Sequence, residues 1–412
     1  MGLNRRDILL TGGGAAATLA VSAPALAQGG PVNQGAPATS EPGQTSTPTA
    51  QTGTLPNNEK KINIVTLRDL EAQAQKVMAP FGYAYVAGGA GDEWTMRENL
   101  AAFNRWVINP EFMAGYGSAD TTTTLLGSKI SYPVITAPVG NQGSVHAQKE
   151  IPNVKGTAAA DTIFCASSVS QLSLEEIAAA SEGPKWFQLY IPRDRGFARE
   201  LLQRAKASGY KAIIVTADVD VTSNRERSMR LQGAAVPNLA MGNVPKTPGG
   251  TGNAMDMKGD MAWSDVEFCR TESGLPVVVK SILSPAQSLK ALQNGAAAVW
   301  LSNHGGRQLD NTASAITMLP LVADAIKGQI PIIADGGVFR GQDVFRALAL
   351  GATAAAIGRP TLYASALGGA LAVQAVHQHL KNELAMVMRL AGTPDIKSIK
   401  REFVGRADVA AS

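Results

Sequence analysis

The sequence lacks the residues that would mark several classes of protein. Its 412 residues include only two cysteines, Cys165 and Cys269, so there is neither a disulfide framework nor a cysteine-based metal site, and we expect no bound metal. The net charge of +4 is small and dispersed, and no lysine and arginine block with interleaved aromatic residues indicates a nucleic-acid partner. No long hydrophobic run follows the N-terminal region, so we expect no membrane span after signal removal.

The N-terminal region predicts export. Residues 1–27 have the twin arginine Arg5-Arg6, then a stretch of small apolar residues, and end in Ala25-Leu26-Ala27, which suits a signal peptidase. These features are typical of a twin-arginine signal peptide and predict a periplasmic or secreted protein, because that route carries folded proteins, often with a cofactor already bound. An uncleaved anchor or a chance pair of arginines is the alternative.

The remaining chain divides into a linker and one large domain. Residues 28–60 are rich in proline, glycine, threonine, glutamine and serine, which predicts a disordered linker. The domain is expected over 61–412, and it should open on a helix with Thr66 as N-cap and Asp69 as its capping partner. With 45% hydrophobic and 17% charged residues, the chain has an ordinary globular composition.

Short apolar runs alternate with helix-like stretches beyond Tyr132. Alternation of this kind predicts an α/β fold, a (β/α)8 TIM barrel of eight parallel strands with an N-terminal helical segment. A segment rich in glycine, proline and methionine, Gln232 to Met261, follows the fourth run and is expected to form a long lid insertion. The eight runs are Pro133 to Ala137, Thr162 to Ala166, Trp186 to Leu189, Ala212 to Thr216, Pro276 to Val279, Ala298 to Leu301, Pro331 to Ala334 and Ala352 to Ile357.

Polar residues cluster directly after these runs, where a barrel of this kind places its active site. The sixth run is followed by the heptad Ser302 to Gln308, which sets His304 three residues before Arg307. A general base and a guanidinium that can hold a carboxylate in a two-bond grip are what oxidation of a 2-hydroxy acid requires. Asn-His-Gly is also a common turn composition, and a lone histidine is more often structural than catalytic.

Several segments together resemble a known family, the FMN-dependent 2-hydroxy-acid oxidases and dehydrogenases, which includes glycolate oxidase and bacterial L-lactate oxidase. The resemblance extends from Ile62 to the C-terminus. Its most specific part is the His-Gly-Gly-Arg-Gln sequence in its barrel context. The matching segments are Tyr85 to Thr95, Trp186 to Tyr190, Ser302 to Gln308, Asp335 to Gly337 and Ile357 to Pro360.

The resemblance implies a reaction and its partners. An FMN-dependent oxidase of (S)-2-hydroxy acids, with L-lactate as the preferred substrate, would form the 2-oxo acid and reduce dioxygen to hydrogen peroxide. An exported dehydrogenase that passes electrons to a quinone or cytochrome is the alternative with the same fold. A non-redox barrel enzyme or a binding protein is the alternative of a different class. The family also implies a homo-oligomer, a tetramer.

Roles at the reaction centre follow from the same resemblance. It implies that His304 is the catalytic base and that Asp218 steadies its imidazolium. Tyr85 and Arg307 would hold the substrate carboxylate, with Tyr190 as a catalytic and substrate contact. Arg225 would assist them, although a solvated charged turn is the alternative for that residue.

The family also implies which residues hold FMN. Lys280 would place a cation beside the flavin and stabilise its reduced form, although a structural ion pair is the alternative. The phosphate is expected after the seventh and eighth strands. The implied cofactor-binding residues are Val139, Gly140, Ser167, Gln188, Thr216, Lys280, Ser302, Asp335, Gly336, Gly337, Gly358 and Arg359.

Two positions depart from the family pattern. Phe339, followed by Arg340, stands where the family usually has an arginine, so phosphate binding would rely on Arg359 and backbone amides. Val169 stands where relatives often carry an aromatic residue that caps the substrate pocket. A smaller residue leaves more room and predicts a wider range of substrates.

Overall fold

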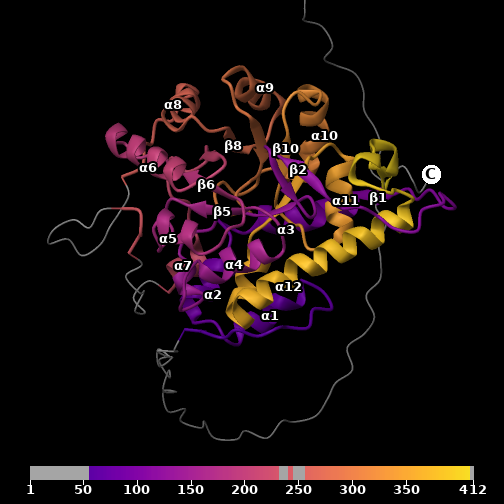
Figure 1. Ribbon diagram of the computed structural model, residues 1–412, viewed down its shortest axis with the longest axis horizontal. Coiled ribbons are helices and arrows are strands. Elements are labelled where there is room, and N and C mark those ends of the chain that lie inside the picture. Colours follow the sequence, from indigo (N-terminus) through magenta and orange to yellow (C-terminus); the bar gives the residue numbers. More distant parts are fainter. Residues whose placement is uncertain (1–54, 232–239, 245–255, 409–412) are drawn as a thin grey trace, which may run out of the picture. The chain divides into compact units, whose positions relative to one another are not determined.

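Eight parallel strands close into a barrel in the computed structural model, which describes residues 55–231, 240–244 and 256–408 (Figure 1). Around the barrel the strand order is β10-β11-β4-β5-β6-β7-β8-β9, so neighbours in the chain are neighbours in the sheet. The prediction of a (β/α)8 barrel is confirmed, and each predicted run overlaps one strand. The strands are β4 (Val134–Thr136), β5 (Phe164–Ser167), β6 (Lys185–Leu189), β7 (Ile213–Thr216), β8 (Val277–Ile282), β9 (Ala298–Leu301), β10 (Ile332–Ala334) and β11 (Ala354–Ile357).

Alternate residues of each strand face the barrel interior and the helices outside, because successive side chains of a strand point to opposite faces. Large side chains such as Trp186 and Trp300 fill the interior, together with Ile135, Ile214 and Ile333. The hairpin of β2 (Thr123–Leu125) and β3 (Ser128–Ile130) belongs to the same buried cluster and closes the N-terminal end of the barrel. The barrel is therefore a packed core, and its opposite end is left for a site.

A helix follows each barrel strand, and local signals set where these helices begin. In α5, Ser173 and Glu176 form a capping box, in which each side chain bonds the other residue's backbone N–H. In α6, buried residues recur at helical spacing from Ala198 to Ala205. These helices are α4 (Ile151–Ala159), α5 (Leu174–Ala179), α6 (Arg195–Ala207), α8 (Ser264–Ser273), α9 (Pro285–Gln293), α10 (Ala315–Ile326), α11 (Gly341–Ala349) and α12 (Arg359–Ala391), the last interrupted at Gly368 and Gly369.

An N-terminal helical segment precedes the barrel, as predicted, with α1 (Asp69–Gln75), α2 (Pro80–Ala87) and α3 (Trp94–Ala101). The prediction of Thr66 as N-cap is wrong. Its hydroxyl accepts a hydrogen bond from the N–H of Arg68 at 3.3 Å, and Arg68 is the N-cap of a helix that begins at Asp69. A turn stabilised by the threonine side chain therefore comes before the helix.

Contacts with the barrel begin within the segment predicted as a linker. The N–H of Ala147 donates to the carbonyl of Pro56 at 2.9 Å, and the N–H of Lys60 donates to the carbonyl of Gly368 at 3.1 Å. Glu59 accepts the N–H groups of residues 370 and 371, just after the interruption in α12. The predicted signal peptide and the linker up to residue 54 lie outside the described residues.

The predicted lid segment follows β7, the fourth strand of the barrel. It lies between α7 (Glu226–Met229) and α8, and only its residues 240–244 and 256–261 are described. Its function as a lid stays a prediction.

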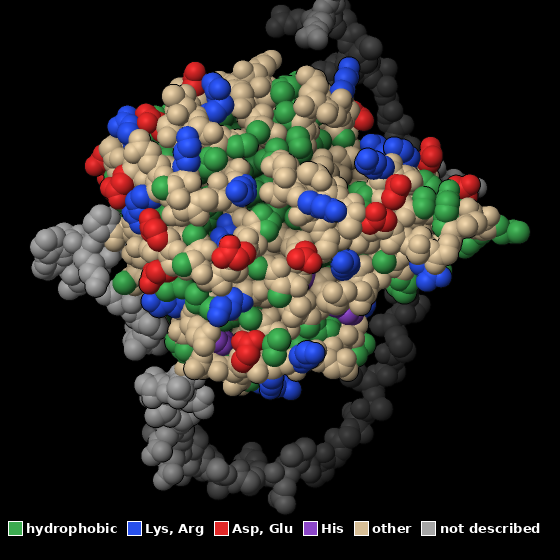
Figure 2. All heavy atoms as spheres, viewed as in Figure 1, with side chains coloured by type: hydrophobic (Ala, Val, Ile, Leu, Met, Phe, Trp, Pro, Cys, Tyr) green, Lys and Arg blue, Asp and Glu red, His purple; other side chains and the backbone are tan. Residues whose placement is uncertain are grey.

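The surface of the described residues has no single dominant charge on the face shown in Figure 2, where basic and acidic side chains are interspersed. None of the described helices combines the length and the apolar character that a membrane crossing needs. Within the same residues, no three histidine, cysteine or acidic side chains gather as metal ligands. Two short strands, β1 (Trp106–Ile108) after the 3-10 helix η1 (Ala102–Arg105) and β12 (Val404–Arg406), pair next to the barrel.

Candidate active site

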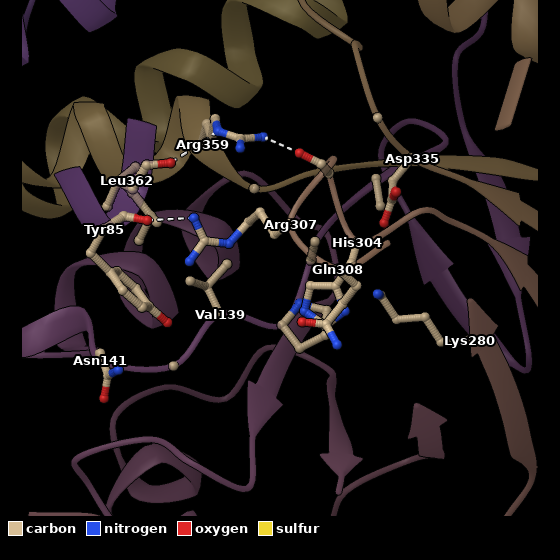
Figure 3. Close-up of a pocket in the computed structure, with 18 of the residues that line it drawn as sticks. Tyr85, Val139, Asn141, Lys280, His304, Arg307, Gln308, Asp335, Arg359 and Leu362 are labelled. Atoms are coloured by element: carbon tan, nitrogen blue, oxygen red, sulfur yellow. Dashed lines mark hydrogen bonds between the residues drawn. The ribbon is translucent and has the colours of Figure 1, made fainter. Parts of the chain in front are cut away.

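A cavity of about 360 Å³ lies at the C-terminal ends of the barrel strands (Figure 3). It brings together residues from α2, from the loops after most of the strands and from the start of α12. Most of the site residues predicted from the sequence line this cavity. They are Tyr85, Val139, Gly140, Tyr190, Arg225, Lys280, His304, Arg307, Asp335, Gly336, Gly337, Gly358 and Arg359.

The loop after β9 turns sharply and presents His304 to the cavity. His304, Gly305 and Gly306 have φ values of +58°, +65° and +74°, which places all three in the left-handed region. At Gly306 a Cβ atom would lie 2.7 Å from the backbone nitrogen of Met96 in α3. Glycine is therefore required there, since it lets α3 approach the loop and fix the position of the histidine.

His304 and Asp218 form a hydrogen-bonded pair. The Nδ1 atom of His304 lies 3.0 Å from one carboxylate oxygen of Asp218 and 3.2 Å from the other. Burial and the charge of Lys280 lower the pKa of His304 to about 4, although Asp218 opposes the shift. Burial raises the pKa of Asp218, but the adjoining imidazole and Lys280 outweigh it and lower the value to about 2. A neutral imidazole beside a carboxylate is an arrangement that can accept a proton.

Tyr190 lies at the other nitrogen of the imidazole. Its hydroxyl is 3.4 Å from Nε2 of His304, and burial raises its pKa, so the phenol stays protonated. Because Nδ1 is occupied by Asp218, Nε2 is the nitrogen left to react with a ligand in the cavity.

Arg307 lies across the cavity from the barrel strands and is held by α2. Its Nη1 donates to the carbonyl oxygens of Tyr85 and, at 2.9 Å, of Gly88, and its guanidinium stacks 4.7 Å from the centre of the Tyr85 ring. Burial lowers the pKa of Arg307 to about 10, so it remains a cation at neutral pH. No acceptor among the described residues engages its Nε and Nη2. Those two donors can hold a carboxylate.

Gln308 joins these residues into one unit, a role that sequence reasoning did not assign. Its amide nitrogen donates to the carbonyls of Asp218 at 2.6 Å and Val221 at 3.2 Å, and its oxygen accepts from Arg225 at 2.8 Å. The Nε atom of Arg225 also donates to the carbonyl of Arg307 at 3.1 Å. Arg225 is thus fixed beside the cavity rather than solvated. The only signal in the sequence was the place of Gln308 in the heptad.

Polar atoms without partners gather where the strands end below the cavity. The Nε2 atom of Gln188 and the Oγ1 atom of Thr216 are buried and have no hydrogen-bond partner among the described residues. Lys280 is 4% exposed, and its ammonium lies 3.5 Å from the hydroxyl of Ser281. Ser167 donates to the oxygen of Gln188 at 2.9 Å and so orients that amide. Donors and a cation at this floor fit a planar ligand with carbonyl and ring nitrogen acceptors.

The loops after β10 and β11 form the opposite end of the cavity. The backbone N–H groups of Gly336, Gly337 and Gly358 have no acceptor among the described residues. Such donors can bind a phosphate. Arg359 lines this end, but its guanidinium donates to the carbonyls of Val86 and Gly305 at 2.9 Å and of Gly88 at 3.0 Å.

The departure at Phe339 lies at the same end. Phe339 lines the cavity, and the guanidinium of Arg68 lies 5.7 Å from the centre of its ring. Arg340 points elsewhere and pairs with Glu383 at 2.9 Å.

Ser302, which does not line the cavity, and Asp335, which does, both bond to neighbouring residues. Ser302 accepts the N–H of His304 at 3.0 Å, and Asp335 accepts from the indole nitrogen of Trp300 at 2.9 Å. Burial raises the pKa of Asp335. No role could be assigned from the sequence to several other lining residues, among them Val219 and Met257, because their apolar side chains carry no chemical signal.

The chain as a whole is similar to known proteins. Residues 74–406 match the model for the FMN-dependent dehydrogenase family. L-Lactate oxidase from Streptococcus iniae is 40% identical over 349 residues, which cover 83% of this chain and 86% of the relative. The crystal structure of lactate oxidase from Pediococcus acidilactici is 36% identical with a TM-score of 0.78, covering 84% and 96% of the two chains. Mandelate oxidase with (S)-2-phenylpropionate gives 33% identity and a TM-score of 0.77, covering 83% and 98%.

Proposed function

Because the chain belongs to the FMN-dependent dehydrogenase family, we propose that it oxidises (S)-2-hydroxy acids, L-lactate among them, to 2-oxo acids with dioxygen as acceptor. It is a flavoenzyme that oxidises 2-hydroxy acids, and we propose its particular substrates, its electron acceptor and the roles of its residues. One observation carries it: a neutral imidazole backed by a carboxylate faces the same cavity as a guanidinium with two free donors.

The described residues fit FMN. The unpaired donors of Gln188 and Thr216, together with the buried Lys280, suit the acceptor edge of the isoalloxazine, and the free backbone N–H groups after β10 and β11 suit its phosphate. When bound, FMN would supply the oxidant, taking the hydrogen of the substrate carbon together with two electrons as a hydride, and would be reoxidised by the acceptor. Lys280 would stabilise the negative charge that reduction brings.

The substrate carboxylate binds Nε and Nη2 of Arg307 in this proposal, while Arg225 adds positive charge beside it. Tyr85 stacks on Arg307 and limits the directions in which the guanidinium can turn. Holding the carboxylate at one end leaves the hydroxyl within reach of Nε2 of His304 and of the Tyr190 phenol. The positioning of substrate and base then reduces the entropy lost in the reaction.

His304 takes the proton. Its Nε2 accepts the hydroxyl proton of the substrate, and the imidazolium that results is stabilised by the carboxylate of Asp218 at Nδ1. Burial and the charge of Lys280 lower the pKa of the imidazole, so it is neutral and able to accept a proton at neutral pH. Water is restricted because His304 and Asp218 have side chains only 17% and 21% exposed.

The acceptor is tested together with the substrate by anaerobic spectroscopy. Addition of L-lactate to the purified protein should bleach the visible flavin bands, D-lactate should not, and air should restore the bands with release of hydrogen peroxide. Bands that no 2-hydroxy acid bleaches would overturn the reaction. Bands that return slowly in air but rapidly with a quinone or cytochrome would make the protein a dehydrogenase, the candidate favoured by a twin-arginine export motif.

Export and assembly complete the proposal. We propose that the twin arginine Arg5-Arg6 directs the folded flavoprotein to the periplasm or medium and that the mature chain forms a homotetramer. Replacing both arginines by lysine should hold the protein and its flavin in the cytoplasm. Export of the variant at the level of the unchanged protein would contradict the first part.

A further inference from the structure

A short described part of the lid segment, residues 240–244, is attached to the loop after β5. The N–H of Gly242 donates to the carbonyl of Ser170 at 2.9 Å. Asn243 is 2% exposed. Its amide nitrogen donates to the hydroxyl of Ser170 at 3.0 Å and to the carbonyl of Ser168 at 3.3 Å. Its amide oxygen accepts the N–H of Leu174 at 2.8 Å. A buried amide with all these bonds is a fixed anchor.

The loop that receives this anchor is itself held firmly. The carboxylate of Glu150 is fully buried and accepts the N–H groups of Gln171 and Leu172, both at 3.0 Å. At Gly242 a Cβ atom would lie 2.3 Å from the carbonyl carbon of Leu172, so the two segments are in direct backbone contact. Residues 240–244 are thus set in one position against a rigid loop.

This attachment places Met241 in the wall of the cavity. Met241 directly precedes the anchored Gly242, and it lines the cavity together with Val169, which lies between the two serines bound by Asn243. Met257 lines the cavity too, and its neighbour Lys258 donates its N–H to the carbonyl of Ile191 at 2.8 Å. Two thioether side chains and a valine therefore contribute an apolar stretch to a wall that also carries charged residues.

We propose that this stretch is the subsite for the substrate side chain, that Met241 sets its width and that Asn243 is the residue that positions Met241. The inference rests on the function proposed above and names its substrate class: 2-hydroxy acids with unbranched aliphatic side chains longer than the methyl group of lactate. Methionine is unbranched and has three rotatable bonds, so it adapts to a flexible chain. The small Val169 leaves the space in which the chain extends.

The unchanged holoenzyme supplies the first test. Anaerobic flavin reduction is followed with L-lactate, 2-hydroxybutyrate, 2-hydroxyhexanoate and the branched 2-hydroxyisovalerate, and the rate constant over Kd is compared. Each added methylene should raise this ratio by about fourfold along the straight-chain series. L-Lactate as the best substrate, or the branched acid as better than the straight ones, would overturn the proposal. Absence of reduction by every acid would instead refute the proposed function.

Variants then test each residue. Met241→Ala should lower the preference for 2-hydroxyhexanoate over L-lactate by roughly fourfold to fifteenfold, since the contacts of one or two methylene groups are lost. The matched control is Met386→Ala, a methionine 48% exposed on α12 and outside the cavity. Equal preference in the two variants would overturn the role of Met241.

Asn243→Ala should raise Kd by a factor that grows with the length of the substrate chain, a pattern that a general loss of stability would not produce. If Asn243 acts through Met241, the double variant should be no worse than Met241→Ala alone. Additive losses would show that Asn243 does not act through Met241. If Asn243→Ala fails to fold, Ser170→Ala is the second variant, because it removes only one hydrogen-bond partner of Asn243. In this variant Kd should also rise with the length of the substrate chain, but less steeply. A Kd that does not depend on chain length would show that Asn243 does not position Met241.

Discussion

In the proposed reaction His304 is neutral before the proton transfer and cationic after it, and different neighbours stabilise these two states. Burial and Lys280 lower the pKa of the imidazole to about 4, which secures the neutral base. Asp218, 3.0 Å from Nδ1, raises that pKa and so stabilises the cation once it forms. For the proposed base, the neutral form before proton transfer and the cation after it are therefore stabilised by separate groups.

Removal of the base should separate chemistry from cofactor binding. We expect His304→Ala to retain FMN and to slow anaerobic flavin reduction by roughly 100- to 10,000-fold, the range in which a positioned base contributes. His379→Ala is the matched control, because that histidine lies on α12 next to Glu383 and outside the cavity. Reduction at the unchanged rate in His304→Ala would refute the assignment.

The pH profile tests the pair directly. His304 is in its base form above its pKa of about 4, so the rate should be lost as pH falls through that value. Asp218→Asn removes the group that raises this pKa; the acidic limb should move to lower pH, and the plateau rate should fall by roughly tenfold or more because the imidazolium loses its partner. Ionisation of the substrate carboxylate affects the pH profiles of both proteins equally, so it does not contribute to the difference between them. An acidic limb at the same pH in both proteins would show that a group other than His304 titrates there.

Most of the predicted site residues line the cavity, the majority of them implied by the family resemblance, but the hydrogen bonds they make were not predicted. His304 and Arg307 could be found because the chemistry restricts which side chains can act and the heptad sets them side by side after a strand. The hydrogen bonds from Arg359 to three backbone carbonyls could not be predicted, because the turn at Gly305 and the end of α2 decide where these carbonyls point. Sequence identifies the group, and the fold decides which of its atoms are free.

At the scale of elements, the strands were predictable because a buried parallel strand is apolar on both faces. Such a strand is visible as an apolar run in its own sequence, without knowledge of the strands it pairs with. The start of α1 was not, because the Thr66 hydroxyl can bond either a helix or a turn, and it bonds the N–H of Arg68. The anchor at Asn243 was also hidden, since its partners lie about seventy residues earlier. Contacts that are remote in sequence are therefore the part that pattern alone misses.

The loop after β10 offers a prediction at this scale. Phe339 lines the end of the cavity proposed for the FMN phosphate, where Arg340 is paired with Glu383 and the guanidinium of Arg359 is bonded to carbonyls. Phe339→Arg should therefore lower the Kd of FMN, by about tenfold, because a guanidinium adds charge-assisted bonds to phosphate. The measurement is quenching of flavin fluorescence on titration of the apoprotein.

Phe339→Leu is the control, because it also removes the ring under Arg68 but adds no charge. If both variants bind FMN as the unchanged protein does, the free backbone N–H groups already satisfy the phosphate.

At the scale of the whole molecule, large apolar side chains gather on one part of the surface. The loop between β1 and β2, purple in Figure 1, carries Phe112, Met113 and Tyr116, which are 74%, 101% and 50% exposed. Leu390, near the end of α12, is 61% exposed, and the N–H of Glu111 bonds the carbonyl of the adjacent Ala391 at 3.0 Å. We call Phe112, Met113, Tyr116 and Leu390 the apolar loop patch. A patch of this kind marks a protein contact more often than a free surface.

The apolar loop patch supports the proposed homotetramer and gives it a test. Burial of these side chains between copies would be lost if charges were introduced, because an unpaired carboxylate in an apolar interface is strongly unfavourable. The double variant Phe112→Asp with Met113→Asp should therefore sediment as a species smaller than the tetramer expected of the unchanged protein. Its flavin spectrum should persist, since neither residue lines the cavity. Val65→Asp, at a side chain 76% exposed and outside this patch, is the control. If the unchanged protein sediments as a monomer, or the double variant stays tetrameric, the patch is not the surface that joins the copies.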